Sequence, residues 1–113
     1  ETWAWPPGTN SYAFATLLQG KVVAALGLPD RGVKDGRHLA EVGKTNSTAV
    51  LIEVFFHDNE SDMARFRERY AEVRDAIAEA VIAWFGIGEQ TELEKLRKFK
   101  ADVEAAFKRL GND

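Results

Sequence analysis

The segment that most constrains the fold is an apolar run near the middle of the chain, Thr48–Phe56, which reads Thr-Ala-Val-Leu-Ile-Glu-Val-Phe-Phe. Such β-branched and aromatic residues are typical of strands, and the lack of strict apolar–polar alternation favours a strand buried on both faces. We therefore predict a central strand here. Because a buried strand needs hydrogen-bonding neighbours on both sides, this prediction requires further strands.

The rest of the sequence offers few such neighbours. We predict one short strand at Leu39–Val42, and the Pro- and Gly-rich first ten residues read as a loop. Two strands are too few for a covered sheet. Either the loop around Trp3 and Trp5 is itself a strand, or the chain is the C-terminal part of a larger domain. The start at Glu1 rather than methionine is what we expect of a cleaved or trimmed product.

Apolar residues at steps of three and four predict three amphipathic helices. The first is capped by Asn10 or Ser11 and runs to about Leu26, and the second, long helix follows a cap at Asn59 and reaches Trp84. The third carries a narrow, coiled-coil-like stripe. It can pack back onto the domain or pair with another helix, as in a homodimer. The residues of this stripe are Leu96, Phe99, Val103, Ala106 and Leu110.

These elements predict an α/β fold, part of a mixed-sheet domain flanked by helices, with an additional C-terminal amphipathic helix. We place the domain portion at residues 1–87, and a linker with the last helix at residues 88–113. With 45% hydrophobic residues among 113, the chain suits one core. No apolar run approaches the about 18 residues of a membrane span. The lack of cysteine excludes disulfides and thiolate chemistry, and the net charge of -3 disfavours a nucleic-acid partner.

Glu53 is the one charged residue of the Thr48–Phe56 run. A buried carboxylate without a partner is costly, so Glu53 either faces solvent at an edge, forms an ion pair, or stands where a strand opens into a cleft. In a cleft it can act as a general acid or base. His38 and His57, the only histidines, lack the spacing of a metal motif, and we expect structural roles for both.

Taken together, several segments resemble the C-terminal half of the zinc-dependent N-acetylmuramoyl-L-alanine amidases, a family of bacterial cell-wall amidases and phage endolysins. The resemblance covers roughly residues 1–87. Two positions depart from the family pattern: Ser47-Thr48 stands where a proline is common, and Phe55 where a glycine follows the glutamate. The segments that carry the resemblance are Arg31-Gly32-Val33-Lys34, Leu39–Val42, Thr45-Asn46, Ala49–Glu53, Phe56 and Asn59–Asp62.

The resemblance implies hydrolysis of the amide between the lactyl group of N-acetylmuramic acid and the L-alanine of the stem peptide. It implies that Glu53 is the catalytic glutamate, which takes a proton from a zinc-bound water. The family's zinc ligands, two histidines and a glutamate, fall upstream of Glu1, and neither His38 nor His57 matches a ligand position. The expected cofactor is therefore zinc, with no metal ligand in this chain.

Our main hypothesis is the C-terminal piece of a peptidoglycan amidase that acts in the cell wall, in the periplasm or outside the cell, or that is encoded by a phage and released at lysis. A non-enzymatic remnant that binds the cell wall or dimerises is the alternative. A third hypothesis is a metal-independent hydrolase that uses Glu53 alone.

Overall fold

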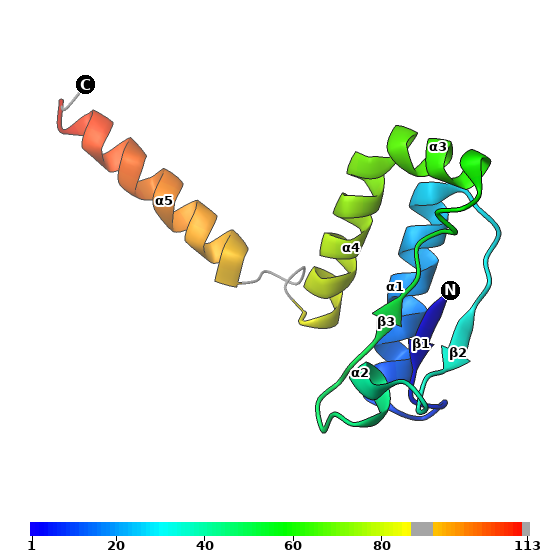
Figure 1. The fold of residues 1–113 in the computed structure, drawn as a ribbon. Coiled ribbons are helices and arrows are strands. Elements are labelled where there is room, and N and C mark those ends of the chain that lie inside the picture. The colour runs from blue at the N-terminus through cyan, green and yellow to red at the C-terminus, as the bar shows by residue number, and fades with distance from the viewer. Residues whose placement is uncertain (87–91, 112–113) are drawn as a thin grey trace. The chain divides into compact units, whose positions relative to one another are not determined.

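The computed structural model describes residues 1–86 and 92–111, and the chain divides into two compact units, Glu1–Val81 and Ile82–Asp113. The first unit combines a small mixed sheet with helices, and helix α5 follows in the second (Figure 1). The prediction of an α/β fold with a C-terminal helix is confirmed. The elements are β1 (Thr2–Ala4), α1 (Asn10–Leu26), β2 (Val33–Asp35), α2 (Ala40–Gly43), β3 (Leu51–Ile52), α3 (Glu60–Glu68), α4 (Tyr70–Trp84) and α5 (Glu92–Arg109).

The sheet has the strand order β2-β1-β3, so the strand from the N-terminal segment is the central one. β1 pairs in parallel with β2, where Thr2 faces Val33, and antiparallel with β3, where Thr2 faces Ile52. The segment around Trp3, one of the two possible sources of extra strands, thus does form a strand. Thr2 and Ala4 are fully buried, as expected for a strand covered on the face toward α1.

Two strand predictions are wrong in their details. The apolar run from Thr48 forms a strand only at Leu51–Ile52, and within the described residues this strand lies at an edge, not at the centre. Leu39–Val42 is not a strand either, because helix α2 occupies Ala40–Gly43. Here the Leu39 carbonyl accepts hydrogen bonds from the amides of Val42 and Gly43, which closes a tight turn that a strand could not form.

The N-cap of helix α1 lies one residue before the predicted cap positions. The side chain of Thr9, not of Asn10 or Ser11, accepts the amide of Tyr12, at 3.2 Å. Ser11 is buried instead, and its hydroxyl accepts the amide of Ala49 at 3.0 Å. The helix ends as predicted at Leu26, where Gly27 takes a left-handed conformation with φ of 73°.

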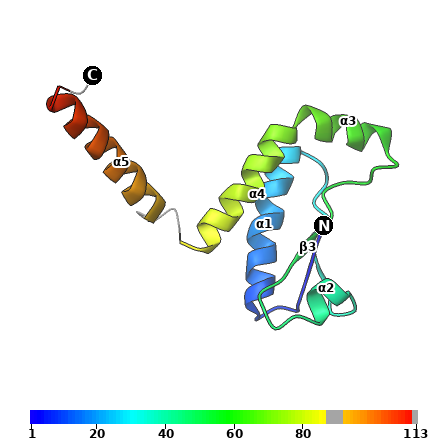
Figure 2. The same cartoon turned by 60° about the vertical axis from the view of Figure 1, so that its left-hand side comes forward.

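The core of the first unit lies between the sheet, α1 and α4. Leu18, Val22 and Leu26 of α1 meet Val73 and Ala80 of α4, and half-buried side chains of β3 and its flanks pack against them. Figure 2 shows α4 running beside α1. A salt bridge of 3.8 Å between Lys21 and Glu79 joins the same two helices at the surface.

The long helix predicted after Asn59 is in fact two helices, because the chain turns at Arg69 between α3 and α4. The bend allows the two halves to meet different parts of α1. On α3, the guanidinium of Arg65 donates to the Leu26 carbonyl at the end of α1, at 2.9 Å, while Val73 and Ala76 of α4 are buried. The predicted cap is confirmed, since the Asn59 side chain accepts the Asp62 amide at 3.1 Å.

Helix α5 appears over the predicted residues, and its large apolar side chains are exposed, from 37% at Val103 to 77% at Leu110. The predicted lead-in to this helix, from Gly88 to Thr91, lies outside the described residues. Among the helices that the structure describes, none combines the length and the apolar character needed to cross a bilayer.

Candidate active site

Glu53 directly follows strand β3 and is held by main-chain hydrogen bonds to Glu1. The Glu53 amide donates to the Glu1 carbonyl at 2.9 Å, and the terminal amine of Glu1 donates to the Glu53 carbonyl at 3.0 Å. The Glu53 side chain is exposed. A carboxylate in this setting keeps access to water while its backbone is fixed by the sheet, which avoids the cost of burying the charge.

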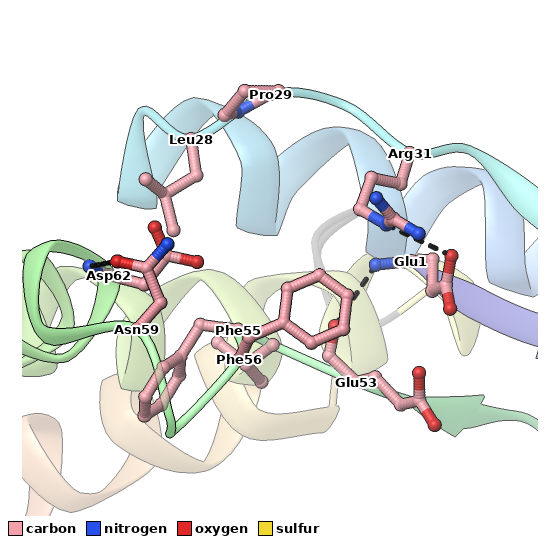
Figure 3. Close-up of a pocket in the computed structure, with 10 residues that line it drawn as sticks. Glu1, Leu28, Pro29, Arg31, Glu53, Phe55, Phe56, Asn59 and Asp62 are labelled. Atoms are coloured by element: carbon pink, nitrogen blue, oxygen red, sulfur yellow. Dashed lines mark hydrogen bonds and ion pairs between the residues drawn. The ribbon is translucent and has the colours of Figure 1, made fainter.

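A cavity of about 250 Å³ opens beside Glu53 (Figure 3). Its walls come from three places: the start of β1, the loop after α1, and the segment that links β3 to α3. Most of the lining is apolar, and its charged members are Glu1, Arg31, Glu53 and Asp62. The predicted catalytic residue therefore lies in a concave site, as ligand-binding residues commonly do. The remaining lining residues are Leu28, Pro29, Val54, Phe55, Phe56 and Asn59.

Arg31 and Glu1 form an ion pair in the wall of this cavity. The Nε of Arg31 donates to Oε2 of Glu1 at 3.2 Å, and the guanidinium carbon lies 4.9 Å from the centre of the Phe56 ring. The Glu1 side chain is only 9% exposed, whereas that of Arg31 is 54% exposed. Burial raises the pKa of the Glu1 carboxyl, but its hydrogen bonds with the side chains of Glu53 and Arg31 and the charge of Arg31 lower it more, so the net pKa is below its usual value.

Phe55 stands at the position where the family pattern has glycine, and its ring packs against helix α3. Its ring stacks on Phe66 of α3 with the ring centres 4.6 Å apart, and Phe66 meets Tyr70 edge-on at 5.7 Å. Phe55 also belongs to the half-buried residues around the core. The large side chain therefore attaches the β3 exit to α3 while it forms part of the cavity wall.

Neither histidine lines the cavity beside Glu53. His38 is exposed and contacts the Trp3 ring edge-on at 5.4 Å, and His57 is exposed in the turn before α3. Within residues 1–86 and 92–111, no three side chains of the types that bind metal ions come together. The described residues thus do not fit the zinc site that the resemblance implies.

Arg31 and Glu1 were not singled out as site residues from the sequence. Arg31 was noted only within the Arg-Gly-Val-Lys run, and Glu1 only as the first residue. Their contact joins positions 30 apart along the chain. It forms only when β1 and β2 pair in parallel and bring the segments before them together, and no periodicity of the sequence reports that pairing.

Comparison with known proteins identifies the family of the chain. Residues 4–83 match the model of a family described as N-acetylmuramoyl-L-alanine amidase. An uncharacterized protein of Clostridium perfringens (strain 13 / Type A) is 33% identical over 81 residues, which are 71% of this chain and 24% of that protein. The chain therefore spans about a quarter of the length of this relative. The match to the family model over most of its residues shows that the chain belongs to the N-acetylmuramoyl-L-alanine amidase family.

Proposed function

We propose that the protein carrying this chain hydrolyses the amide between N-acetylmuramic acid and the L-alanine of the peptidoglycan stem, with Glu53 as general base and acid. Membership in the amidase family supports the reaction. The position of Glu53, anchored at the end of β3 and lining the cavity, is the single observation that supports the residue. On this proposal residues 1–87 are the C-terminal portion of the catalytic domain.

The chemistry asked of Glu53 is two proton transfers. Its carboxylate accepts a proton from water as the water oxygen attacks the carbonyl carbon of the scissile amide. It then returns that proton to the amide nitrogen as the carbon–nitrogen bond breaks. The products are the free lactyl carboxylic acid of the sugar and the free amino group of L-alanine. Solvent exposure of the carboxylate suits this role, because the water and the substrate must both reach it.

Zinc is the cofactor that family membership suggests, and we place its ligands outside these 113 residues. Support comes from family membership and from the small share of the Clostridium relative that the chain spans. Metal analysis of the intact protein is the direct test. About one zinc per chain in the intact protein, with none retained by residues 1–113 alone, is the expected result; zinc bound by this segment would contradict it.

The experiment for Glu53 is a pair of substitutions in the intact protein. Glu53→Gln keeps the size of the side chain but removes the base, and we expect amidase activity on purified peptidoglycan to fall by roughly 10²- to 10⁴-fold. Glu41→Gln is the matched control, because Glu41 is also exposed but lies on α2 and outside the cavity lining. Equal activity of the two variants, with unchanged thermal unfolding, would reject the role of Glu53.

A second candidate function, pairing of two chains, is favoured by the exposed stripe of α5. Leu96 and Phe99 are 61% and 65% exposed, which leaves apolar surface that a partner helix can cover. We propose a homodimer through this stripe, either in the enzyme or in a non-enzymatic remnant that binds the wall. Phe99→Glu should then reduce the mass measured by light scattering at high concentration to that of a monomer. A wild-type protein that is monomeric at every concentration would exclude the dimer.

The proposed substrate also sets the proposed location. Peptidoglycan lies in the cell wall, so we place the site of action in the wall, in the periplasm or outside the cell. Release of a phage-encoded enzyme at lysis is one route there. Fractionation of producing cells, with antibody detection of the protein in wall and cytoplasmic fractions, tests this location.

A further inference from the structure

We propose that Arg31 is a specificity residue that binds a carboxylate of the stem peptide, close to the scissile amide. This inference rests on the proposed function, since it names the part of the same substrate that this side of the cavity recognises. The chemistry it assigns is a guanidinium fork that pairs with a free carboxylate and not with its amide.

The first support is the way Arg31 is held. Its Nε donates to the nearly buried Glu1 carboxylate, and its guanidinium lies against the Phe56 ring. A guanidinium has five N–H donors in a rigid plane. Among the described residues, its hydrogen bonding is through Nε, so the terminal nitrogens remain available on a side chain that is 54% exposed. Arg31 is therefore oriented before any ligand arrives, and little side-chain entropy remains to be lost on binding.

The second support is charge. Of the side chains that line the cavity in the described residues, that of Arg31 is the one with a positive charge. Three acidic residues also line the cavity: Glu1 pairs with Arg31, and Asp62 lies in the first turn of α3, where the helix dipole favours a negative charge. The third, Glu53, is exposed to water. An anionic group of a ligand can be stabilised in this cavity by the outer edge of Arg31, which can bridge Glu1 and a second carboxylate.

The third support is proximity to Glu53. Glu1 connects the two residues, because its main chain is hydrogen-bonded to the main chain of Glu53 and its carboxylate to Arg31. Figure 3 shows Glu1 between Arg31 and Glu53. A volume of about 250 Å³ corresponds to roughly eight water molecules of about 30 Å³ each, which is the size of one or two amino-acid residues. A carboxylate bound there would belong to one of the first two stem residues after the cleaved bond.

In peptidoglycan stems, the residue after L-alanine is D-glutamate, whose carboxyl is free in some cell walls and amidated in others. The amide has the same shape but no charge, and its NH₂ group donates where Arg31 also donates. A site built around Arg31 should therefore prefer the free acid. The preference expected from one hydrogen bond to a charged group is roughly 10- to 100-fold in affinity.

The test measures binding by calorimetry in the intact protein with Glu53→Gln, so that the ligand is not hydrolysed. The probes are N-acetylmuramoyl-L-alanyl-D-glutamate and its D-isoglutamine amide, both with the γ-carboxyl blocked as a methylamide, so that they differ only in the charge of the α-carboxyl. We expect tighter binding of the acid, and loss of this preference when Arg31→Gln is added. A preference that persists without Arg31, or no preference in the first place, would overturn the proposal.

Two further variants separate recognition from folding. Arg37→Gln is the matched control, because Arg37 is also 54% exposed and also pairs with a carboxylate, Asp35, but lies outside the cavity lining. It should leave the preference unchanged. Arg31→Lys keeps a charge beside Glu1 without the planar fork, so it should fold and retain only part of the preference. Failure of the proposed role of Glu53 would appear separately, as full hydrolysis of the probes by the Glu53→Gln protein, and failure of the proposed reaction as no hydrolysis by the wild type.

Discussion

Helices α1 and α5 have nearly the same length, 17 and 18 residues, and the sequence predicts both from the same apolar spacing. Their surroundings are opposite. Leu18 and Leu26 of α1 are 3% and 2% exposed, whereas Leu96 and Leu110 of α5 are 61% and 77% exposed. The spacing of apolar residues thus determines which side chains share a face of the helix, but it does not determine whether anything covers that face.

The difference in burial between α1 and α5 also determines what their leucines can stabilise, the fold itself or a contact with a partner. Burying a leucine side chain contributes roughly 1.5–3 kcal/mol relative to leaving it exposed. α1 gains this contribution within the first unit, where the sheet and α4 cover it, and so positions β1, β2 and the cavity. The leucines of α5 keep most of that energy available for a partner. The function proposed for the first unit depends on a fixed geometry, while the pairing proposed for α5 depends on a second chain that covers it.

Truncating one leucine in each helix tests whether α1 is buried and α5 exposed. Leu26→Ala should lower the free energy of unfolding by about 2–5 kcal/mol, because Leu26 is buried in the core and a cavity would remain. Leu96→Ala should change it by about 0.5 kcal/mol or less, because Leu96 is mostly exposed. Urea denaturation at low protein concentration measures both.

The same pair of variants also reports on dimerisation. If α5 pairs with a second chain, the cost of Leu96→Ala should grow as the protein concentration is raised, since association stabilises the folded state by mass action. The cost of Leu26→Ala should not depend on concentration in the same way. Equal costs for the two variants at low concentration would show that the contrast between the helices is wrong.

A smaller effect is expected at the buried polar contact between β1 and α1. The Thr2 hydroxyl donates to the Gln19 side chain at 2.8 Å, and both residues are buried. Thr2→Val removes the donor and leaves the Gln19 oxygen without it, which should lower the free energy of unfolding by about 1–3 kcal/mol. Thermal unfolding monitored by circular dichroism provides the measurement.

Thr16→Val is the control for this substitution. Thr16 is on the exposed side of the same helix, where its hydroxyl donates to the Tyr12 carbonyl at 2.9 Å. Water can replace that bond, so the cost should be a few tenths of a kcal/mol. A Thr16 effect as large as that of Thr2 would mean that the buried contact contributes nothing beyond the change of residue.

A still smaller change in the free energy of unfolding, this time an increase, is expected from a substitution on the exposed face of α1. Gly20 lies within the helix, and a Cβ added there would meet nothing within 4 Å. Gly20→Ala should therefore raise the free energy of unfolding by about 0.5–1 kcal/mol, because alanine loses less backbone entropy in a helix. Chemical denaturation compares the variant with the wild type. A loss of stability would show that the outer face of α1 is covered after all.

The sequence predicted the helices well because a helix is a local structure. The end of α1 at Gly27 and the cap at Asn59 depend on residues within one turn, and both are confirmed. The break at Arg69 was missed, because the apolar spacing continues through it. On its N-terminal side, Arg65 of α3 donates to the end of α1, a contact between distant segments that no local pattern reports.

Strands and site residues depend on such distant contacts throughout. The family resemblance pointed to Glu53, and the structure places that residue at the cavity. The prediction of a strand at Leu39–Val42 failed because the hydrogen bonds that the Leu39 carbonyl accepts from the Val42 and Gly43 amides outweighed the weak strand preference of these residues. Arg31 and Glu1 could not be paired in advance, since their contact exists only after β1 enters the sheet.

The smallest expected effect is a pH dependence of the free energy of unfolding. It comes from Asp30, which contacts Gln19, the α1 residue that also bonds to Thr2 of β1. Asp30 accepts a hydrogen bond from the Gln19 side chain at 2.8 Å and another from the Gly32 amide at 2.8 Å, and these two bonds lower the pKa of its carboxyl below the usual value. A lowered folded-state pKa means that the carboxylate contributes stability above the unfolded pKa of about 3.9, and that this contribution is lost as the pH falls through the folded pKa.

Asp30→Asn isolates this contribution, because asparagine keeps an acceptor oxygen for both bonds but does not titrate. The wild type should exceed the variant in stability at about pH 5.5, and the difference should shrink as the pH falls to about 3. Denaturation at both pH values measures the change. Since Asp30 is exposed to solvent, the effect should be smaller than that of Thr2→Val and should weaken further in high salt. A difference that grows toward low pH would mean that the folded state raises the Asp30 pKa. The ionised Asp30 would then not stabilise the folded state through its hydrogen bond with Gln19. In that case, apolar packing alone would keep the loop before β2 against α1.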